Sequence, residues 1–388
     1  MIKKFLIIIS NFLYKIHYKI YILLNDYLQD KKHFSPYILK KKYSKGTIRI
    51  VHVNGNFVVG GTTQLIVDII ENMSEKYAHE IIVPDYPEPL PYQPVNIHKY
   101  SIYELSKLYD FLKENPPAAI HIHYWVRYNS RHDSIALWYA AVFKICEELA
   151  IKVIQNVNVP TEPFDSSAVV CNIFVSKYVL DNFNTSKISC SVIYPGSNFN
   201  HFKNDSDSLL SNESIGMVYR LDKDKLNAEA IEIFISVVKK RPSIQCYIVG
   251  GGFYFDYYKQ RVKEEGLERK IIFTGYVSYK ALPDYYKKIG LLVAPVHDES
   301  FGQVTPFAMS MGLCVAGYDT GALSEILGSK ETLVKYGDID KLVDSIVSLM
   351  GDHRKRLAIG LSNRKRAHEL FAVESMIVEY EKIYNTYV

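Results

Sequence analysis

Short apolar segments alternate with amphipathic ones along most of this chain, and this alternation limits the possible folds more than any other feature. In the first half, the apolar segments are residues 47–53, 79–83, 118–123, 152–157 and 169–175, and the helical ones are 62–75, 103–113 and 133–148. Apolar strands that alternate with helices are typical of a parallel sheet covered on both faces. We therefore expect an α/β fold.

A polar linker interrupts this pattern before a second strand–helix series begins. Residues 194–214 are rich in Gly, Asn, Ser and Asp, which favour turns and loops. We predict two Rossmann-like domains that face a cleft, because parallel sheets bind ligands at the carboxyl ends of their strands. The predicted parts are an extension (1–45), an N-terminal acceptor domain (46–200), a C-terminal donor domain (201–370) and a C-terminal helix that packs back on the N-terminal domain (371–388).

The N-terminal extension is basic and amphipathic. The whole chain has a net charge of +4, whereas ten lysines and two aspartates give residues 1–45 a charge of +8. Lys15 and Lys19 lie in the middle of its apolar stretch, and each would cost about 2.5–3.5 kcal/mol at the centre of a bilayer. The segment is therefore not predicted to cross a membrane. Three interpretations stay open. The segment binds an anionic membrane surface, packs on the protein's own core or on another copy, or, as the least favoured, is a signal anchor.

The charge pattern and the cysteines limit the class of protein. The basic excess is lysine in an extension rather than arginine on the folded body, so nucleic acid is not an expected partner. Five scattered cysteines without a CxxC pair predict neither disulfides nor a zinc site and suit a reducing compartment. No cleavage site follows the apolar run, so we expect a cytoplasmic protein that is peripheral on the inner face of the plasma membrane.

Neither histidines nor acid triplets predict a metal site. His121 and His123 share one side of a strand, but no third ligand lies at a natural spacing from them. Three DxD triplets are present at 205–207, 222–224 and 338–340, and we interpret them as chance.

Two loops carry features that suit an anion. Gly60 and Gly61 lie between the first strand and the first helix, where a helix N-terminus and bare backbone favour a phosphate. Arg220 and Lys225 follow the first strand of the second series. A guanidinium fork and an ammonium that converge on one dianion suit a diphosphate.

The stretch "ESFGQVTPFAMSMG" (299–312) combines an acid with a helix start. Thr305 is the expected N-cap and Pro306 the first helical residue. Glu299 is positioned to accept hydrogen bonds from sugar hydroxyls. The expected phosphate donors are the backbone N–H groups of Gly302, Gln303, Val304 and Thr305.

The order and spacing of these motifs resemble one family. The second half is similar to the retaining GT-B glycosyltransferases of family 4, the glycosyl transferases group 1, which move sugars from nucleotide donors. The resemblance rests on "MVYRLDKDK", "YIVGGG", "IIFTGYVSYKALPDYY", "ESFGQVTPFAMSMGLCVAGYDTGALSEIL" and "LVKYGDIDKLVDSIVSLM". In the first half, "GGTTQLIVDI", "IHIHYW" and "VIYPGSNFNHF" match less specifically.

The resemblance implies roles in the C-terminal domain. Arg220 and Lys225 match the pair that holds the donor diphosphate and stabilises the leaving nucleotide. Glu299 matches the first acid of the E-x7-E motif, which contacts the transferred sugar, and Gly302 begins the loop whose amides face sugar and phosphate. Gly275 and, next to it, Tyr276 lie where the family brackets the base.

It also implies roles in the N-terminal domain. Gly60 and Gly61 match the glycine loop near the β-phosphate. His123 matches a histidine near the anomeric centre, with His121 as the alternative.

Two positions depart from the family pattern. Phe307 occupies the place of the second Glu, which holds the ribose hydroxyls, and an apolar ring cannot accept those hydrogen bonds. Each lost hydrogen bond of this kind typically costs about 0.5–1.5 kcal/mol. Asn158 stands where the family often has a histidine.

The resemblance implies a retaining, metal-independent hexosyl- or N-acetylhexosaminyltransferase with no cofactor. Its expected partners are a nucleotide-sugar, most simply a UDP- or GDP-sugar, and a lipid-linked or surface glycan such as a capsule, O-antigen or teichoic-acid precursor. A nucleotide-sugar epimerase or a sugar phosphorylase of the same fold is one alternative. A non-catalytic, degenerate transferase that acts as a scaffold is another.

Overall fold

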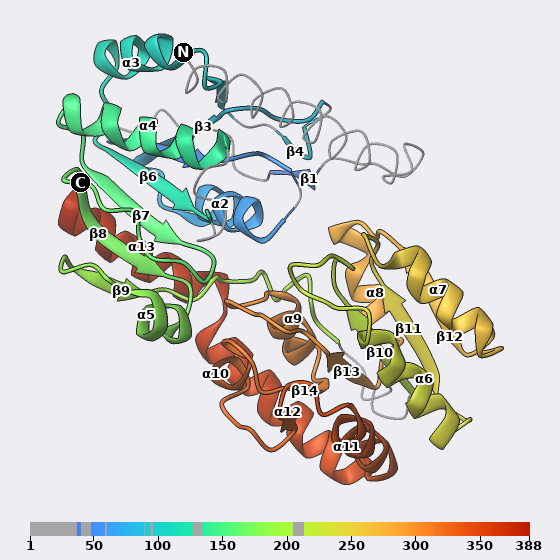
Figure 1. The fold of residues 1–388 in the computed structure, drawn as a ribbon. Coiled ribbons are helices and arrows are strands. Elements are labelled where there is room, and N and C mark those ends of the chain that lie inside the picture. Colours follow the sequence, from blue (N-terminus) through green and yellow to red (C-terminus); the bar gives the residue numbers. More distant parts are fainter. Residues whose placement is uncertain are drawn as a thin grey trace. The chain divides into compact units, whose positions relative to one another are not determined.

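The computed structural model describes residues 37–39, 48–58, 60–88, 90–93, 96–126, 134–204 and 213–388. They form two compact units (Figure 1). The first contains the described residues up to Tyr194 together with Met376–Val388, and the second is Pro195–Ser375. Most of the extension 1–45 lies outside the described residues, and with it the predicted membrane contact.

The first unit is built on a seven-stranded parallel sheet in the order β5-β3-β2-β6-β7-β8-β9. Its strands are β2 (Ile48–Asn54), β3 (Tyr77–Val83), β5 (Ile97–Lys99), β6 (Ala119–Tyr124), β7 (Val153–Val157), β8 (Val169–Phe174) and β9 (Cys190–Val192). A separate short pair joins β1 (Tyr37–Ile38) to β4 (Tyr92–Gln93).

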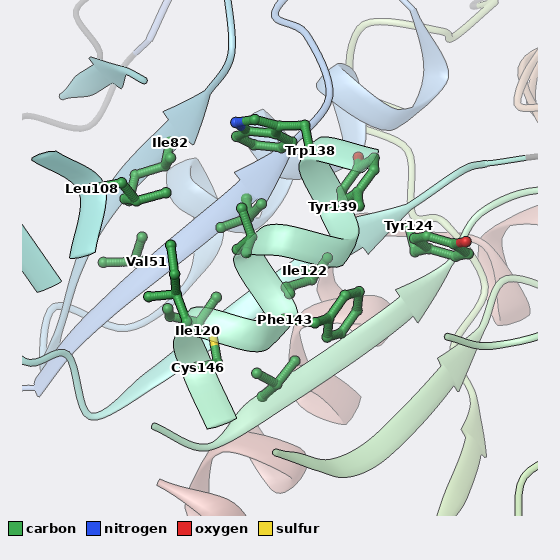
Figure 2. Packing of buried hydrophobic residues seen from close by; sticks show 14 of the residues in the cluster. Val51, Ile82, Leu108, Ile120, Ile122, Tyr124, Trp138, Tyr139, Phe143 and Cys146 are labelled. Atoms are coloured by element: carbon green, nitrogen blue, oxygen red, sulfur yellow. The ribbon is translucent and has the colours of Figure 1, made fainter. Parts of the chain in front are cut away.

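Helices cover both faces of this sheet because its strands present apolar side chains on both sides. The helices of the unit are α2 (Gly61–Asn72), α3 (Leu105–Glu114), α4 (Ser134–Glu148), α5 (Lys177–Phe183) and, from Met376 onward, α13 (Val373–Tyr387). Figure 2 shows α4 directing Trp138 and Phe143 toward the sheet, where they join Val51, Ile120 and Ile122 in one buried cluster. The opposite face is covered by α2 and by residues of α13.

The last residues of the chain are part of the first unit. The Tyr380 hydroxyl donates a hydrogen bond to Asn156 Oδ1 at 2.7 Å, and the Tyr384 hydroxyl lies 2.8 Å from His121 Nδ1. The sequence placed a C-terminal helix at 371–388 for this role, and the structure assigns residues from Met376 onward to the unit.

The second unit has a six-stranded parallel sheet in the order β12-β11-β10-β13-β14-β15. Its strands are β10 (Ser214–Val218), β11 (Gln245–Val249), β12 (Ile271–Gly275), β13 (Leu291–Ala294), β14 (Cys314–Tyr318) and β15 (Leu333–Val334). Its helices are α6 (Ala230–Lys240), α7 (Phe255–Glu264), a 3-10 turn (Tyr279–Ala281), α8 (Leu282–Tyr286), α9 (Val304–Ser310), α10 (Leu323–Leu327), α11 (Ile339–Gly351) and α12 (His353–Leu370). None of the described helices of either unit has the length and apolar character needed to cross a membrane.

Each sheet has one point at which the strand order reverses. In the first unit the later strands β3 and β5 lie on one side of β2, and β6 lies on the other side. In the second unit β11 and β12 lie on one side of β10, and β13 lies on the other. Parallel sheets bind ligands outside the carboxyl ends of the strands at such a point. The loops after β2, β6, β10 and β13 are therefore the places to look for a site.

Candidate functional site

The loops after β10 and β13 bring Lys225 and Glu299 together. Lys225 Nζ donates a hydrogen bond to Glu299 Oε1 at 2.7 Å and lies 3.4 Å from the Asp298 carbonyl oxygen. Glu299 is only 1% exposed. A buried carboxylate is costly unless a cation compensates it, so this ion pair joins the two loops at the point where the strand order reverses.

Two glycines pack against Glu299, one at its carboxylate and one at its backbone. Gly302 has a φ of +69°, and a Cβ added there would lie 2.3 Å from Glu299 Oε2. Gly321, with a φ of +54°, passes so close to the Glu299 backbone that a Cβ would lie 2.1 Å from its carbonyl oxygen. Oε2 itself is buried and has no hydrogen-bond partner among the described residues. One carboxylate oxygen is thus fixed by Lys225, and the other is an unused acceptor.

Arg220 is paired separately from Lys225. Its side chain is 46% exposed, and its guanidinium donates to Asp222 Oδ2 at 3.2 Å and to Asp224 Oδ2 at 2.8 Å. The sequence interpretation treated the triplet 222–224 as chance and missed this role of its two acids. Their spacing of two and four residues from Arg220 within one turn was the available signal. The structure therefore places Arg220 and Lys225 in one loop, each with its own carboxylate partner.

The helix that follows Glu299 begins earlier than predicted. Helix α9 starts at Val304 with Gln303 as N-cap, so the prediction of Thr305 as the N-cap was wrong. Pro306 lies in the first turn, where its missing N–H leaves no hydrogen bond unmade, so the Thr–Pro pair does not mark the boundary. The Thr305 N–H donates to the Gly302 carbonyl at 3.1 Å, and it is therefore already used within the loop.

Phe307 lies in the apolar interior of the second unit. Its ring is 4% exposed and stacks on Phe202 with a centroid distance of 3.9 Å and an interplanar angle of 5°. The ring of Tyr279 meets it edge-on at 5.9 Å. The position at which the resemblance expects a ribose-binding carboxylate is thus occupied by a packed aromatic pair.

The loops after β11 and β12 are held against each other. The Gly250 N–H donates to the Gly275 carbonyl at 3.0 Å, and the Tyr276 ring lies against Gly251, where an added Cβ would be 2.6 Å from the ring. A Cβ at Gly250 would lie 1.9 Å from the Tyr219 carbonyl oxygen. The glycines of this loop are therefore required for close packing beside the loop that carries Arg220.

In the first unit, the predicted glycine loop is open. Gly60 is the N-cap of α2, and its carbonyl accepts a hydrogen bond from the Gln64 N–H at 2.9 Å. An added Cβ at Gly60 or at Gly61 would meet no atom within 4 Å. The packing of the described residues thus does not explain why glycine occupies these two positions.

His123 and its alternative His121 are both fully buried in the first unit. His123 Nε2 lies 3.1 Å from His52 Nδ1, and His52 Nε2 lies 2.9 Å from His79 Nδ1. These four histidines form a buried cluster, which we call the histidine cluster. The β2–β6 pairing aligns His52 with His121, which are far apart in the sequence. This alignment is why the sequence interpretation missed His52 as a neighbour.

Burial keeps three imidazoles of the histidine cluster neutral, those of His52, His121 and His123. It lowers the pKa of His121 to about 3 and the pKa values of His52 and His123 well below the usual range, with neighbouring histidines adding to the effect. One ring nitrogen each from His52, His121 and His123 lie within 4.8 Å of one another, so a third potential metal ligand is present after all. We assign no metal to the cluster, because that group contains no anionic ligand to compensate a buried dication.

Part of the chain is similar in sequence to known glycosyltransferases. Residues 199–366 match the family model described as Glycosyl transferases group 1. The lipopolysaccharide core biosynthesis mannosyltransferase LpsB of Rhizobium meliloti is 34% identical over 120 residues, which are 30% of this chain and 34% of that protein. The capsular polysaccharide biosynthesis glycosyltransferase CapM of Staphylococcus aureus is 27% identical over 210 residues, which are 50% and 53% of the two chains. The chain thus matches about a third to a half of the length of these relatives.

Solved structures extend the similarity to both units. Anabaena Alr3699/HepE in complex with UDP and glucose has a TM-score of 0.71 at 16% identity and covers 87% of this chain and 100% of its own. A sucrose-phosphate synthase from Thermosynechococcus elongatus has a TM-score of 0.70 at 16% identity, with 87% and 98% covered. Together with the two parallel sheets, these neighbours confirm the predicted α/β class and the GT-B fold.

The packing of Gly302 against Glu299 predicts that alanine is less well tolerated at position 302 than at Gly337. We expect Gly302→Ala to destabilise the second unit by more than Gly337→Ala does. Both glycines have positive φ, but a Cβ at Gly337 would meet nothing within 4 Å, so that variant carries the backbone strain of about 1–2 kcal/mol alone. Urea unfolding followed by circular dichroism measures both. Equal losses of stability would show that the Glu299 carboxylate does not restrict position 302.

The histidine cluster predicts a loss of stability at mildly acidic pH. The folded-state pKa values lie below the usual histidine value of 6.5, so below that pH the unfolded chain binds more protons and the free energy of unfolding falls. Three such groups contribute up to about 4 kcal/mol per pH unit until their folded pKa values are reached. Both tryptophans lie in the first unit, so their fluorescence during urea unfolding between pH 7 and pH 5 reports the change.

The matched control for this measurement is His353→Asn, which removes an exposed histidine of the second unit. It is expected to leave the pH dependence unchanged. A free energy of unfolding of the first unit that stays constant from pH 7 to pH 5 would contradict the neutral, buried state of the histidine cluster.

Proposed function

We propose that the protein is a retaining glycosyltransferase that moves a sugar from a UDP- or GDP-sugar to a glycan of the cell envelope. The observation that carries the proposal is the ion pair of Lys225 with the buried Glu299, which joins the loops after β10 and β13 where the second sheet reverses its strand order. The match of residues 199–366 to Glycosyl transferases group 1 supports it. So does the similarity to LpsB and CapM, whose names refer to lipopolysaccharide core and capsular polysaccharide biosynthesis.

In the proposed mechanism, Arg220 and Lys225 bind the donor diphosphate. Arg220 is half exposed, and exposed ion pairs such as those with Asp222 and Asp224 are weak, so a dianion that binds more strongly can replace these carboxylates as its partner. Lys225 adds a second positive charge at the same loop. Together they stabilise the charge that develops on the departing diphosphate, without a dedicated metal.

Glu299 is proposed to position the transferred sugar. Its Oε2 is the proposed acceptor for a sugar hydroxyl, because Lys225 holds the other oxygen and no described group donates to Oε2. A hydrogen bond from a hydroxyl to a charged group of this kind is worth about 1.5–3 kcal/mol. The amides from Gly302 to Val304 stay candidates for the sugar–phosphate contact.

The proposed transfer takes place on one face of the sugar. The acceptor hydroxyl forms a bond to the anomeric carbon while the bond from that carbon to the diphosphate oxygen breaks. The acceptor's proton passes to the departing phosphate oxygen. Because the acceptor attacks the face from which the diphosphate leaves, the configuration at the anomeric carbon is retained. We give His123 no contact with the reacting atoms, because its ring is fully buried and its Nε2 lies against His52. The loop of Gly60 and Gly61 remains a candidate anion site of the first unit.

The base end of the donor is proposed to bind near Gly275 and Tyr276, with Phe307 altering the ribose contact. Because Phe307 is packed on Phe202, position 307 offers no acceptor for the ribose hydroxyls. Position 307 then distinguishes ribose donors from deoxyribose donors less strongly than a glutamate would. The same buried pair is the observation that favours the second candidate, a non-catalytic transferase-like partner.

The acceptor is proposed to be a lipid-linked glycan at the inner face of the plasma membrane. The names of LpsB and CapM place those relatives in envelope polysaccharide synthesis. The basic extension 1–45 supplies the charge for an anionic membrane surface. A cytoplasmic, peripheral protein fits both.

Arg220→Ala tests the proposed function with least risk to folding, because the side chain is half exposed. We expect thermal-shift titrations with UDP-, GDP-, dTDP- and ADP-sugars to give a stabilised wild type with one or two of them. Arg220→Ala should lose that stabilisation, and transfer to membrane glycolipids followed by mass spectrometry should fall about 100-fold or more.

The matched control is Lys240→Ala, which removes an exposed cation paired with Asp344 in the same unit. It should bind and transfer like the wild type. Donor binding that is unchanged in Arg220→Ala would refute the diphosphate role. Donor binding without transfer to any glycan would favour the non-catalytic partner.

A further inference from the structure

An exposed aromatic ring lies beside the proposed diphosphate loop. Phe253, in the loop after β11, is 64% exposed. The Lys223 ammonium lies 4.0 Å from the centroid of its ring, within the range of a cation–π contact. The ring of Tyr254 is perpendicular to it at 5.0 Å. An exposed phenylalanine next to a cation in a candidate site needs a reason beyond the ordinary scatter of apolar surface residues.

The position of Phe253 is fixed by its backbone. Its N–H donates to Asp222 Oδ1 at 2.8 Å, and the next N–H, of Tyr254, donates to the Leu221 carbonyl at 2.8 Å. Gly252 has a φ of +142°, and an added Cβ would lie 2.6 Å from the same Asp222 oxygen. The loop is therefore held against the residues that follow β10, and the exposure of the ring is a consequence of this packing.

Lys223 differs from the other cations of its turn. Arg220 is paired with Asp222 and Asp224, and Lys225 with Glu299. Lys223 makes no ion pair with a carboxylate in the described part of the chain, and its ammonium rests on the Phe253 ring. Its charge is thus available to an incoming anion, and the aromatic face holds it in place until then.

The strand order of the second sheet indicates which kind of ligand could reach Lys223 and Phe253. Strand β11 lies between β10 and β12, so Phe253 lies on the side of the Arg220 loop away from β13 and Glu299. A ligand whose anionic centre binds at Arg220, with its sugar toward Glu299, extends its other end past Lys223 to Phe253. For a nucleoside diphosphate that other end is a flat base, which stacks well on an aromatic ring.

From this arrangement we infer that Phe253 stacks on the base of the nucleotide and that Lys223 moves from the ring to the phosphate next to the ribose. This inference rests on the proposed function and adds two residues to its donor site. It also provides the base with a contact that depends on its flat face rather than on the identity of its edge. Uracil and guanine can both stack on the ring in this way.

The test is isothermal titration calorimetry of the full-length protein with UDP, GDP and inorganic pyrophosphate. We expect Phe253→Ala to weaken UDP and GDP about tenfold, which is the size of one base–aromatic stacking contact, and to leave pyrophosphate unchanged. Lys223→Met should weaken all three ligands. Near-ultraviolet circular dichroism checks that the variants keep their packing.

Two matched controls lie on the following helix. Tyr257→Ala removes another exposed aromatic ring, and Lys259→Met removes another lysine that lies over a ring, at 5.4 Å from Phe255. Both should bind like the wild type. Affinities of Phe253→Ala that equal those of Tyr257→Ala would overturn the stacking role while leaving the proposed function intact. A wild type that binds neither nucleotide would overturn both.

Discussion

The ion pair between Lys225 and Glu299 is the interaction on which the rest of the site depends. A carboxylate with almost no exposure persists at the end of a strand because an ammonium lies 2.7 Å from it. The pair links the loops on the two sides of the switch in strand order. The other carboxylate oxygen, Oε2, lies against Gly302 and has no hydrogen-bond donor in the described part of the chain. In the proposed function, this one contact couples phosphate binding by the cations to sugar binding by the acid.

Much of this architecture is predictable from sequence, because it follows from local patterns. Apolar runs that alternate with amphipathic ones predicted two parallel α/β units, and Lys225 and Glu299 were recognised as a cation and an acid after strands of the second unit. Phe307 was recognised as a departure from the family pattern. What it does in the fold was not predictable, since its stacking on Phe202 joins residues about a hundred positions apart.

The features that sequence reasoning missed depend on strand register and on turn geometry. His52 joins His121 and His123 only because β2 pairs in parallel with β6, and no spacing along the chain reveals that alignment. The acids Asp222 and Asp224 were dismissed with other triplets, although one turn of chain brings both to Arg220. The error in placing the start of α9 arose because Pro is tolerated beyond the first helical position, since the first N–H groups of a helix have no intrahelical partner.

The coupling between Lys225 and Glu299 is tested most directly by a double-mutant cycle. The affinity for the nucleotide-sugar donor is measured for Lys225→Met, for Glu299→Gln and for the double variant. If the pair acts as one unit, the double variant loses less affinity than the sum of the single losses, by about tenfold or more. Losses that simply add would mean that the two residues act independently, and the account of the site given above would be wrong.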